Sequence, residues 1–212
     1  MIAVVDYGVG NLFSVVRSLR AIGEDAVVTG DPGTLDTADG IILPGVGAFG
    51  EAAEKLRATG LDEYLKDAAG KGRPLLGICL GMQLLLEESL EFGVHRGLGL
   101  ISGRVVPLRD RVPTDFKVPH IGWNALEIKK KDSPLMKYSS DGDCVYFVHS
   151  YYGADCGDDV IATADYHVEV AAAVGRGSVF GCQFHPEKSG RVGLGILRAF
   201  ADFAAGIGGI RC

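Results

Sequence analysis

Cys79 lies between two glycines in the segment Gly77-Ile78-Cys79-Leu80-Gly81, which follows an apolar run and precedes a helical pattern. A cysteine placed there sits on a sharp strand-to-helix turn, and the flanking glycines permit the tight backbone. The start of the helix offers N–H groups and the positive end of the dipole, which favour a thiolate. The pattern indicates a nucleophile, with the N–H of Leu80 placed to donate to an oxyanion. A buried structural cysteine is the alternative that this segment alone leaves open.

A histidine and a glutamate form the second candidate group, just after the apolar segment Phe180–Phe184. Residues two apart in an extended chain point to one side, so Glu187 can hold the imidazole of His185 in one tautomer and stabilise its charged form. Among the five histidines, only His185 has an acidic residue at this spacing just past an apolar strand. We therefore expect a base and an orienting acid here.

The loop Pro44-Gly45-Val46-Gly47 is the third candidate, because it follows the expected strand Gly40–Leu43. In open parallel sheets, ligands bind beyond the carboxyl ends of the strands. The glycines around Val46 let this peptide reorient, so that its N–H becomes a second oxyanion donor. A plain strand-to-helix turn would have the same sequence.

The first part of the chain alternates strand and helix patterns, which predicts parallel βαβ units with right-handed crossovers. The expected strands are Ile2–Val5, Ala26–Thr29, Gly40–Leu43 and Pro74–Ile78, and the expected helices are Asn11–Ile22, Ala48–Ala58, Leu61–Ala69 and Leu80 to about Glu88.

From about Leu100 the pattern changes to short segments separated by Gly, Asp and Pro, which predict antiparallel or mixed strands added to the sheet. A closing helix is expected at Val192–Phe203, followed by a loose tail, Gly206–Cys212. The prediction is one domain over residues 1–212, of α/β class, with a mostly parallel central sheet flanked by helices. The added strands are expected at Gly103–Leu108, Ala125–Ile128, Val145–Val148, Val160–Ala164, Val170–Val174 and Val179–Phe184.

Composition excludes several classes of protein. The chain has 212 residues, 47% hydrophobic and 23% charged, with a net charge of −6 and no basic patch suited to nucleic acid. No apolar run approaches the roughly 20 residues that span a bilayer, and no signal peptide is evident, so we expect a cytoplasmic protein. Five irregularly spaced cysteines favour reduced thiols, and Cys182-x-x-His185 lacks a second pair of ligands, so no metal and no cofactor are expected.

Taken together, these segments resemble the class I (triad) glutamine amidotransferases, a flavodoxin-like α/β family. More narrowly, the chain resembles the glutaminase subunits of imidazole glycerol phosphate synthase, from histidine biosynthesis. The Tyr-Gly-x-Gly-Asn opening, His-x-Gly-Trp-Asn and the Lys-Ser-Gly that follows the glutamate indicate this narrower group. The supporting segments are 6–12 (DYGVGNL), 44–49 (PGVGAF), 77–83 (GICLGMQ), 119–124 (PHIGWN), 146–152 (YFVHSYY) and 183–190 (QFHPEKSG).

The resemblance implies glutamine as substrate, Cys79 as nucleophile, His185 as base and acid, and Glu187 as the orienting acid. It also implies that the amino-acid end of glutamine is held by residues of three segments, while the oxyanion is held by the N–H groups of Val46 and Leu80. The implied glutamine contacts are Gly47, Gln83, Ser150 and Tyr151. From spacing alone, a surface position on the helix remains open for Gln83.

The resemblance further implies a partner, a (β/α)₈-barrel cyclase that uses the ammonia to form imidazole glycerol phosphate and an aminoimidazole carboxamide ribotide. The implied interface residues are Asn11, Trp123, Tyr146 and Lys188. Plainer alternatives are a helix cap for Asn11, core or rim positions for the two aromatic residues, and a solvated charge for Lys188.

Three rivals remain. Another class I amidotransferase, such as the aminodeoxychorismate or pyridoxal phosphate synthase glutaminase, would share the triad. A non-catalytic interaction subunit would keep the fold without forming a glutamyl adduct. A cysteine protease on a related fold would need a substrate cleft. A dinucleotide site at Gly8-Val9-Gly10 is disfavoured because Phe13 occupies the position where that fingerprint needs a small residue.

Overall fold

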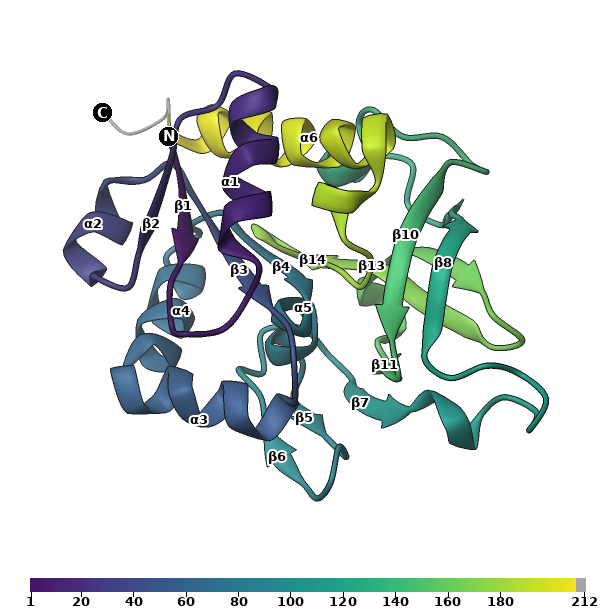
Figure 1. Cartoon of the computed structure of the whole chain (residues 1–212). Helices are drawn as coiled ribbons and strands as arrows, with labels where there is room; N and C mark the ends of the chain where they lie inside the picture. The colour runs from purple at the N-terminus through teal and green to yellow at the C-terminus, as the bar shows by residue number, and fades with distance from the viewer. Residues whose placement is uncertain (209–212) are drawn as a thin grey trace.

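The structure, a computed structural model that describes residues 1–208, contains one large sheet with helices on both faces and two smaller sheets beside it (Figure 1). The strand order of the large sheet is β2-β1-β3-β4-β14-β13-β12-β9. The strands from β2 to β14 are parallel, and β13, β12 and β9 extend the sheet in antiparallel fashion. The predicted α/β class, mostly parallel with added antiparallel strands, is confirmed.

The parallel part follows the predicted alternation of strands and helices. Its first four strands are β1 (Ile2–Val5), β2 (Ala26–Thr29), β3 (Gly40–Gly45) and β4 (Leu75–Cys79). The fifth, β14 (Val179–Cys182), was expected among the antiparallel or mixed strands of the second half but pairs with β4 in parallel. The helices of the chain are α1 (Leu12–Ala21), α2 (Pro32–Thr37), α3 (Phe49–Thr59), α4 (Leu61–Gly70), α5 (Leu80–Leu85) and α6 (Gly190–Gly208).

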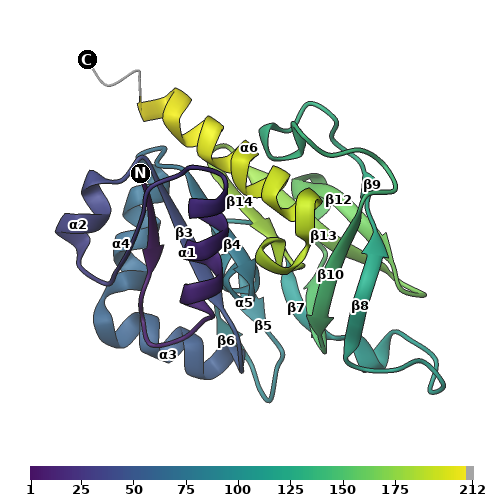
Figure 2. The same cartoon turned by 45° about the horizontal axis from the view of Figure 1, so that its top comes forward.

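Both faces of β1, β3, β4 and β14 are buried, because successive side chains point to opposite faces and each face carries a helical layer. The edge strand β2 is only partly buried. On β1, Ile2 and Val4 pack with α1 and α6, whereas Ala3 and Val5 pack with α3, α4 and α5. Figures 1 and 2 show α1 and α6 together on one side of the sheet. This double burial accounts for apolar runs without alternation in the sequence.

The second part of the chain supplies the remaining strands. The large sheet ends with β13 (Glu169–Arg176), β12 (Val160–Asp165) and β9 (Glu127–Ile128). The pair β8 (His120–Ala125) and β10 (Cys144–His149) stands beside it (Figure 2), and a four-stranded sheet contains β11 (Tyr151–Ala154), β7 (Arg104–Pro107), β5 (Glu88–Ser89) and β6 (His95–Arg96). The 3-10 turns within residues 1–208 are η1 (Leu108–Asp110), η2 (Pro134–Met136), η3 (Gly157–Asp159) and η4 (Pro186–Lys188).

The helix after Cys79 is shorter than predicted, which is a correction to the expected end at about Glu88. Leu86 is extended, with φ −71° and ψ 174°, so α5 ends at Leu85. Glu88 instead pairs with Arg96 and Arg104 in the four-stranded sheet. The tertiary pairing of β5 thus overrides the local helical pattern.

Other element boundaries also differ. The expected strand Ala125–Ile128 is divided, because Ala125 ends β8 and only Glu127–Ile128 form β9. Strands β5, β6 and β11, helix α2 and most of β8 were not predicted. Helix α6 begins at Gly190 and continues to Gly208, so residues 206–208 of the predicted tail are helical, and residues 209–212 lie outside the described part.

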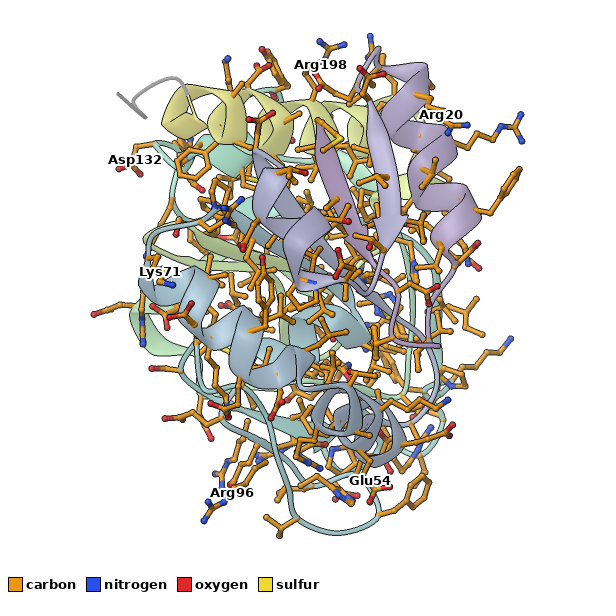
Figure 3. The ribbon with its side chains drawn as sticks, turned by 90° about the vertical axis from the view of Figure 1, so that its left-hand side faces the viewer. Arg20, Glu54, Lys71, Arg96, Asp132 and Arg198 are labelled. Atoms are coloured by element: carbon orange, nitrogen blue, oxygen red, sulfur yellow. The ribbon has the colours of Figure 1, made fainter. Side chains whose placement is uncertain are left out.

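The outer surfaces of the helices carry charge. Arg20 on α1, Glu54 on α3 and Lys71 after α4 are exposed and point outward (Figure 3). Within residues 1–208, no helix combines the length and apolar character needed to cross a membrane.

Candidate functional site: a cysteine, histidine and glutamate at one edge of the sheet

Cys79 occupies a strained turn between β4 and α5. Its backbone has φ 54° and ψ −110°, a conformation that residues with a side chain rarely adopt. The neighbouring glycines are required by close backbone packing: a Cβ on Gly77 would lie 2.6 Å from the carbonyl oxygen of Gly81, and one on Gly81 would collide with the carbonyl oxygen of Leu43. The predicted nucleophile turn is therefore present, and its geometry depends on both glycines.

The ends of three strands meet at this turn. In the parallel register, Gly45 of β3 lies beside Cys79 of β4, and Cys182 of β14 lies beside Ile78. The Val46 loop after β3 and the His185 segment after β14 therefore flank the cysteine. This is the edge at which parallel sheets bind ligands.

His185 and Glu187 form a buried pair. His185 Nδ1 lies 2.8 Å from Glu187 Oε1, and the side chains are 3% and 1% exposed. The backbone N–H of His185 donates to the carbonyl of Tyr146, and the hydroxyl of Ser189 donates to the carbonyl of His185. These two bonds fix the backbone of His185, and Glu187 holds the ring at Nδ1, which leaves Nε2 for the cavity side.

Two opposing influences set the charge of His185. Burial, the largest, lowers the pKa of the imidazole, but hydrogen bonding to Cys79 and Glu187, together with their negative charges, raises it to about 9. A protonated imidazole near neutral pH favours a thiolate beside it. Glu187, which faces Nδ1, compensates the charge of the protonated ring.

A cavity of about 330 Å³ opens over the cysteine. This volume suits a small polar ligand of amino-acid size. Both Cys79 and His185 line it, and Glu187 lies behind His185. The other lining residues that the sequence predicted are Val46, Gly47, Leu80, Gln83, Ser150, Tyr151 and Lys188.

Gln83 is buried, 5% exposed, so the alternative of a surface helix position is wrong. Its Nε2 donates to the carbonyl of Tyr151 at 2.9 Å and to Oε1 of Gln183 at 3.0 Å. Gln83 thus ties α5 to β11 and to the end of β14. Its remaining amide oxygen is available to a ligand in the cavity.

The expected interface residues lie on elements around the same edge. Trp123 is 58% exposed and meets the ring of Tyr146 edge-on, with centroids 6.1 Å apart. The ammonium of Lys188 lies 5.9 Å from the centroid of the Tyr146 ring. The side chain of Asn11 caps α1 by accepting a hydrogen bond from the N–H of Ser14. A helix cap was the plainer alternative for this residue.

Four residues that line the cavity were not predicted from the sequence as site residues: Glu91, Pro119, Val148 and His149. Glu91, 8% exposed, accepts the N–H of Phe49 at 2.6 Å and adds a carboxylate to the wall. It comes from the unpredicted connection between β5 and β6, and no sequence signal marked it. His149 and Gln183 stand in quoted motifs, but their apolar neighbours suggested only strand positions.

Within residues 1–208, no three Cys, His, Asp or Glu side chains gather in a way that could hold a metal ion. Cys182 is fully buried behind the site, and burial raises the pKa of its thiol well above the usual value. Its Sγ contacts the carbonyl of Gly77. Cys182 is a packing residue of β14.

Known proteins share this architecture and sequence. The profile of the family described as class-I glutamine amidotransferase matches residues 3–202. The imidazole glycerol phosphate synthase subunit HisH of Geobacillus sp. (strain WCH70) is 49% identical over 215 residues, covering 98% of this chain and 99% of that protein. The subunit of the same name from Bacillus velezensis is 50% identical over 209 residues, covering 97% of each chain.

Two solved structures support the fold. A glutamine amidotransferase superposes with a TM-score of 0.75 at 18% identity, covering 97% of this chain and 100% of that one. PurLQS from Thermotoga maritima superposes with a TM-score of 0.74 at 22% identity, covering 95% and 97%. With the family profile spanning nearly the whole chain, the protein belongs to the class-I glutamine amidotransferase family.

Proposed function

We propose that this chain is the glutaminase subunit of an imidazole glycerol phosphate synthase and serves histidine biosynthesis as a single domain over residues 1–212. Relatives that carry this subunit name are 48–50% identical over at least 95% of the chain. The observation that carries the catalytic proposal is the buried pair of His185 and Glu187 in the wall of the cavity that contains Cys79.

The reaction begins when the Cys79 thiolate attacks the side-chain amide carbon of glutamine. The oxyanion accepts hydrogen bonds from the N–H of Leu80 and from the peptide of Val46, once that exposed loop has turned its N–H inward. Gly47 has φ +97° and open space around it, which supports such a rotation. The imidazolium of His185 protonates the departing nitrogen, and ammonia leaves as the C–N bond breaks.

The second half of the reaction hydrolyses the γ-glutamyl thioester. Neutral His185 takes a proton from water, the hydroxyl oxygen attacks the thioester carbon, and glutamate leaves with restoration of the thiolate and imidazolium. Glu187 keeps Nδ1 protonated throughout, so that Nε2 remains the catalytic nitrogen. No cofactor enters either step.

The amino-acid end of glutamine is held by polar groups at the far side of the cavity. Gln83 offers its amide oxygen, Gly47 and Ser150 offer backbone groups near Tyr151, and Glu91 offers a carboxylate for the α-ammonium. Burial of Gln83 and Glu91 supports this assignment, because buried polar groups orient a ligand more strongly than solvated ones.

The ammonia is used by a cyclase subunit, for which we propose a (β/α)₈ barrel docked over the cavity mouth. Ammonia released into water near neutral pH would mostly become ammonium, which is not nucleophilic, so a covered path to the acceptor is needed. Trp123, Tyr146, Lys188 and Asn11 are the proposed contacts. The exposed indole of Trp123 on β8 suits an interface anchor.

Replacement of the nucleophile tests the division of labour between the subunits. In the complex with its cyclase, Cys79→Ala should abolish glutamine-dependent synthesis, because no thioester can form, while synthesis from added ammonium salts continues at the wild-type rate. Both activities are measured from the same preparation by following formation of the ribotide product. Loss of the ammonium-dependent activity as well would contradict the proposal.

A further inference from the structure

The carbonyl oxygen of Tyr151 accepts hydrogen bonds from two side chains on the cavity wall. Gln83 Nε2 lies 2.9 Å from it and His149 Nδ1 lies 3.1 Å from it. A carbonyl oxygen can only accept. Tyr151 therefore fixes the amide of Gln83 with its NH₂ group toward β11, and it fixes His149 as the tautomer protonated on Nδ1.

The tautomer of His149 is held by a second histidine. With Nδ1 protonated, His149 Nε2 must accept, and it does so from Nδ1 of His120 at 3.0 Å. Burial, followed by the charge of His120, lowers the pKa of His149 to about 3, so the ring stays neutral in ordinary conditions. The orientation at Tyr151 therefore persists over the working pH range.

The orientation of Gln83 determines that of Gln183, the residue after β14. The NH₂ group of Gln83 also donates to Oε1 of Gln183 at 3.0 Å. Gln183 must then present its oxygen to Gln83 and its own NH₂ group to the opposite side. There, Nε2 of Gln183 lies 3.7 Å from the sulfur of Cys79, within range of an N–H···S hydrogen bond.

Burial makes this contact strong for its length. Gln183 is 0% exposed, and its backbone N–H is anchored on the carbonyl of Ala172 at 2.9 Å. The amide therefore meets the sulfur away from bulk solvent, where a donor facing a charged acceptor acts more strongly than the same pair in water.

We propose that Gln183 is a further catalytic residue, which donates an N–H to the sulfur of Cys79 and so stabilises the thiolate; this rests on the proposed function, in which Cys79 is the nucleophile. The donor acts twice in the reaction. It favours the thiolate before attack on glutamine, and it stabilises the same sulfur as the leaving group when the thioester is hydrolysed.

The test is the pH dependence of Cys79 alkylation by iodoacetamide in the full-length chain, quantified by peptide mass spectrometry so that Cys144 and the other cysteines are counted separately. Gln183→Met keeps the length of the side chain but removes the donor. Its profile should move to higher pH by about one unit, a roughly tenfold loss of thiolate at a given pH. Gln183→Glu, closest in shape, should move it further because a carboxylate repels the thiolate.

For Gln183→Met the shift can be assigned to the lost donor, because this variant adds no charge and leaves the other titratable neighbours of Cys79 in place, namely His185, Tyr7 and Cys182. Thr163→Val is the matched control, since Thr163 is a buried polar residue (3% exposed) on β12, separated from β14 by β13. Its profile should coincide with that of the wild type. Circular dichroism establishes that each variant is folded.

Coincident profiles for wild type and a folded Gln183→Met would overturn the proposal. If that variant fails to fold, an unshifted Gln183→Glu would overturn it equally. The proposed function has its own readout, which is reaction of wild-type Cys79 with a diazo-ketone analogue of glutamine. Reaction with the analogue but no shift in the variants refutes the role of Gln183 alone, whereas no reaction in the wild type refutes the glutaminase site.

Discussion

The parallel region and the small sheets meet at the cavity, and they hold their functional groups in different ways. In the parallel region, backbone-to-backbone contacts at Gly77 and Gly81 fix Cys79, and every side chain of β4 is buried. In the small sheets, β8 and β10 form a two-stranded pair with Trp123 exposed on it. The parallel region thus holds the nucleophile in a rigid position. The small sheets surround the cavity and carry exposed side chains.

Surface exposure sharpens this difference. Large apolar side chains of β1, β3 and β4 are buried without exception, whereas β8 exposes Ile121 and Trp123, each 58% accessible. Exposed aromatic and aliphatic groups on a polar protein mark contact surfaces. Substitutions in the parallel region should therefore impair folding and glutamine hydrolysis. Substitutions on the exposed side of the small sheets should impair binding of the partner.

The largest expected effect is at the turn of the parallel region. Gly81→Ala places a Cβ against the carbonyl of Leu43, where neither backbone can yield without moving β3 or α5. We expect the free energy of unfolding to fall by about 3 kcal/mol, at the upper end for overpacking, and glutamine hydrolysis to be lost. Urea denaturation and a glutamate assay measure the two effects.

Gly70→Ala is the matched control for this change. Gly70 ends α4, has no atom within 4 Å of a built Cβ and has no positive φ. Alanine there should leave stability unchanged or raise it by a few tenths of a kcal/mol. If Gly81→Ala behaved like Gly70→Ala, backbone packing would not be what holds the cysteine.

A smaller effect is expected at the small sheets. Trp123→Ala should weaken binding of the cyclase subunit about 30-fold, corresponding to a hot-spot loss of about 2 kcal/mol, while the isolated chain unfolds at nearly the wild-type urea concentration. Isothermal titration calorimetry measures the affinity. Tyr138→Ala, which truncates an aromatic residue 48% exposed beside α6, should not change it. Equal losses in both variants would remove the distinction between the surfaces.

The same division explains how much of the fold and site the sequence could predict. Cys79 and the Val46 loop stand at strand ends in a βαβ pattern, so their meeting followed from parallel topology. The parallel pairing of β14 with β4, which brings the His185 segment to the same edge, was not part of that pattern. The end of α5 and the burial of Gln83 depend on the short strands β5 and β11, which both pair with β7, a strand that is next to neither of them in the sequence. Local patterns do not encode such pairings.

Residues whose role depends on a contact with a second side chain could not be predicted from the sequence either. Gln183 resembles an ordinary strand residue until the orientation of Gln83 is known, and His149 depends in the same way on His120. Glu91 lines the cavity where the β5–β6 connection brings its carboxylate to the N–H of Phe49 at the start of α3. The role of each of these three residues depends on a contact between segments far apart in the chain, which no single motif shows.

In the proposed function, Cys79 is a nucleophile activated by His185 at a cavity that accepts glutamine. Mass spectrometry of the wild-type chain after incubation with a diazo-ketone analogue of glutamine tests it most directly. We predict one adduct per chain, confined to the peptide that contains Cys79, with formation slowed by excess glutamine. Modification of Cys144 or Cys156 in its place, or labelling that glutamine does not slow, would contradict the account.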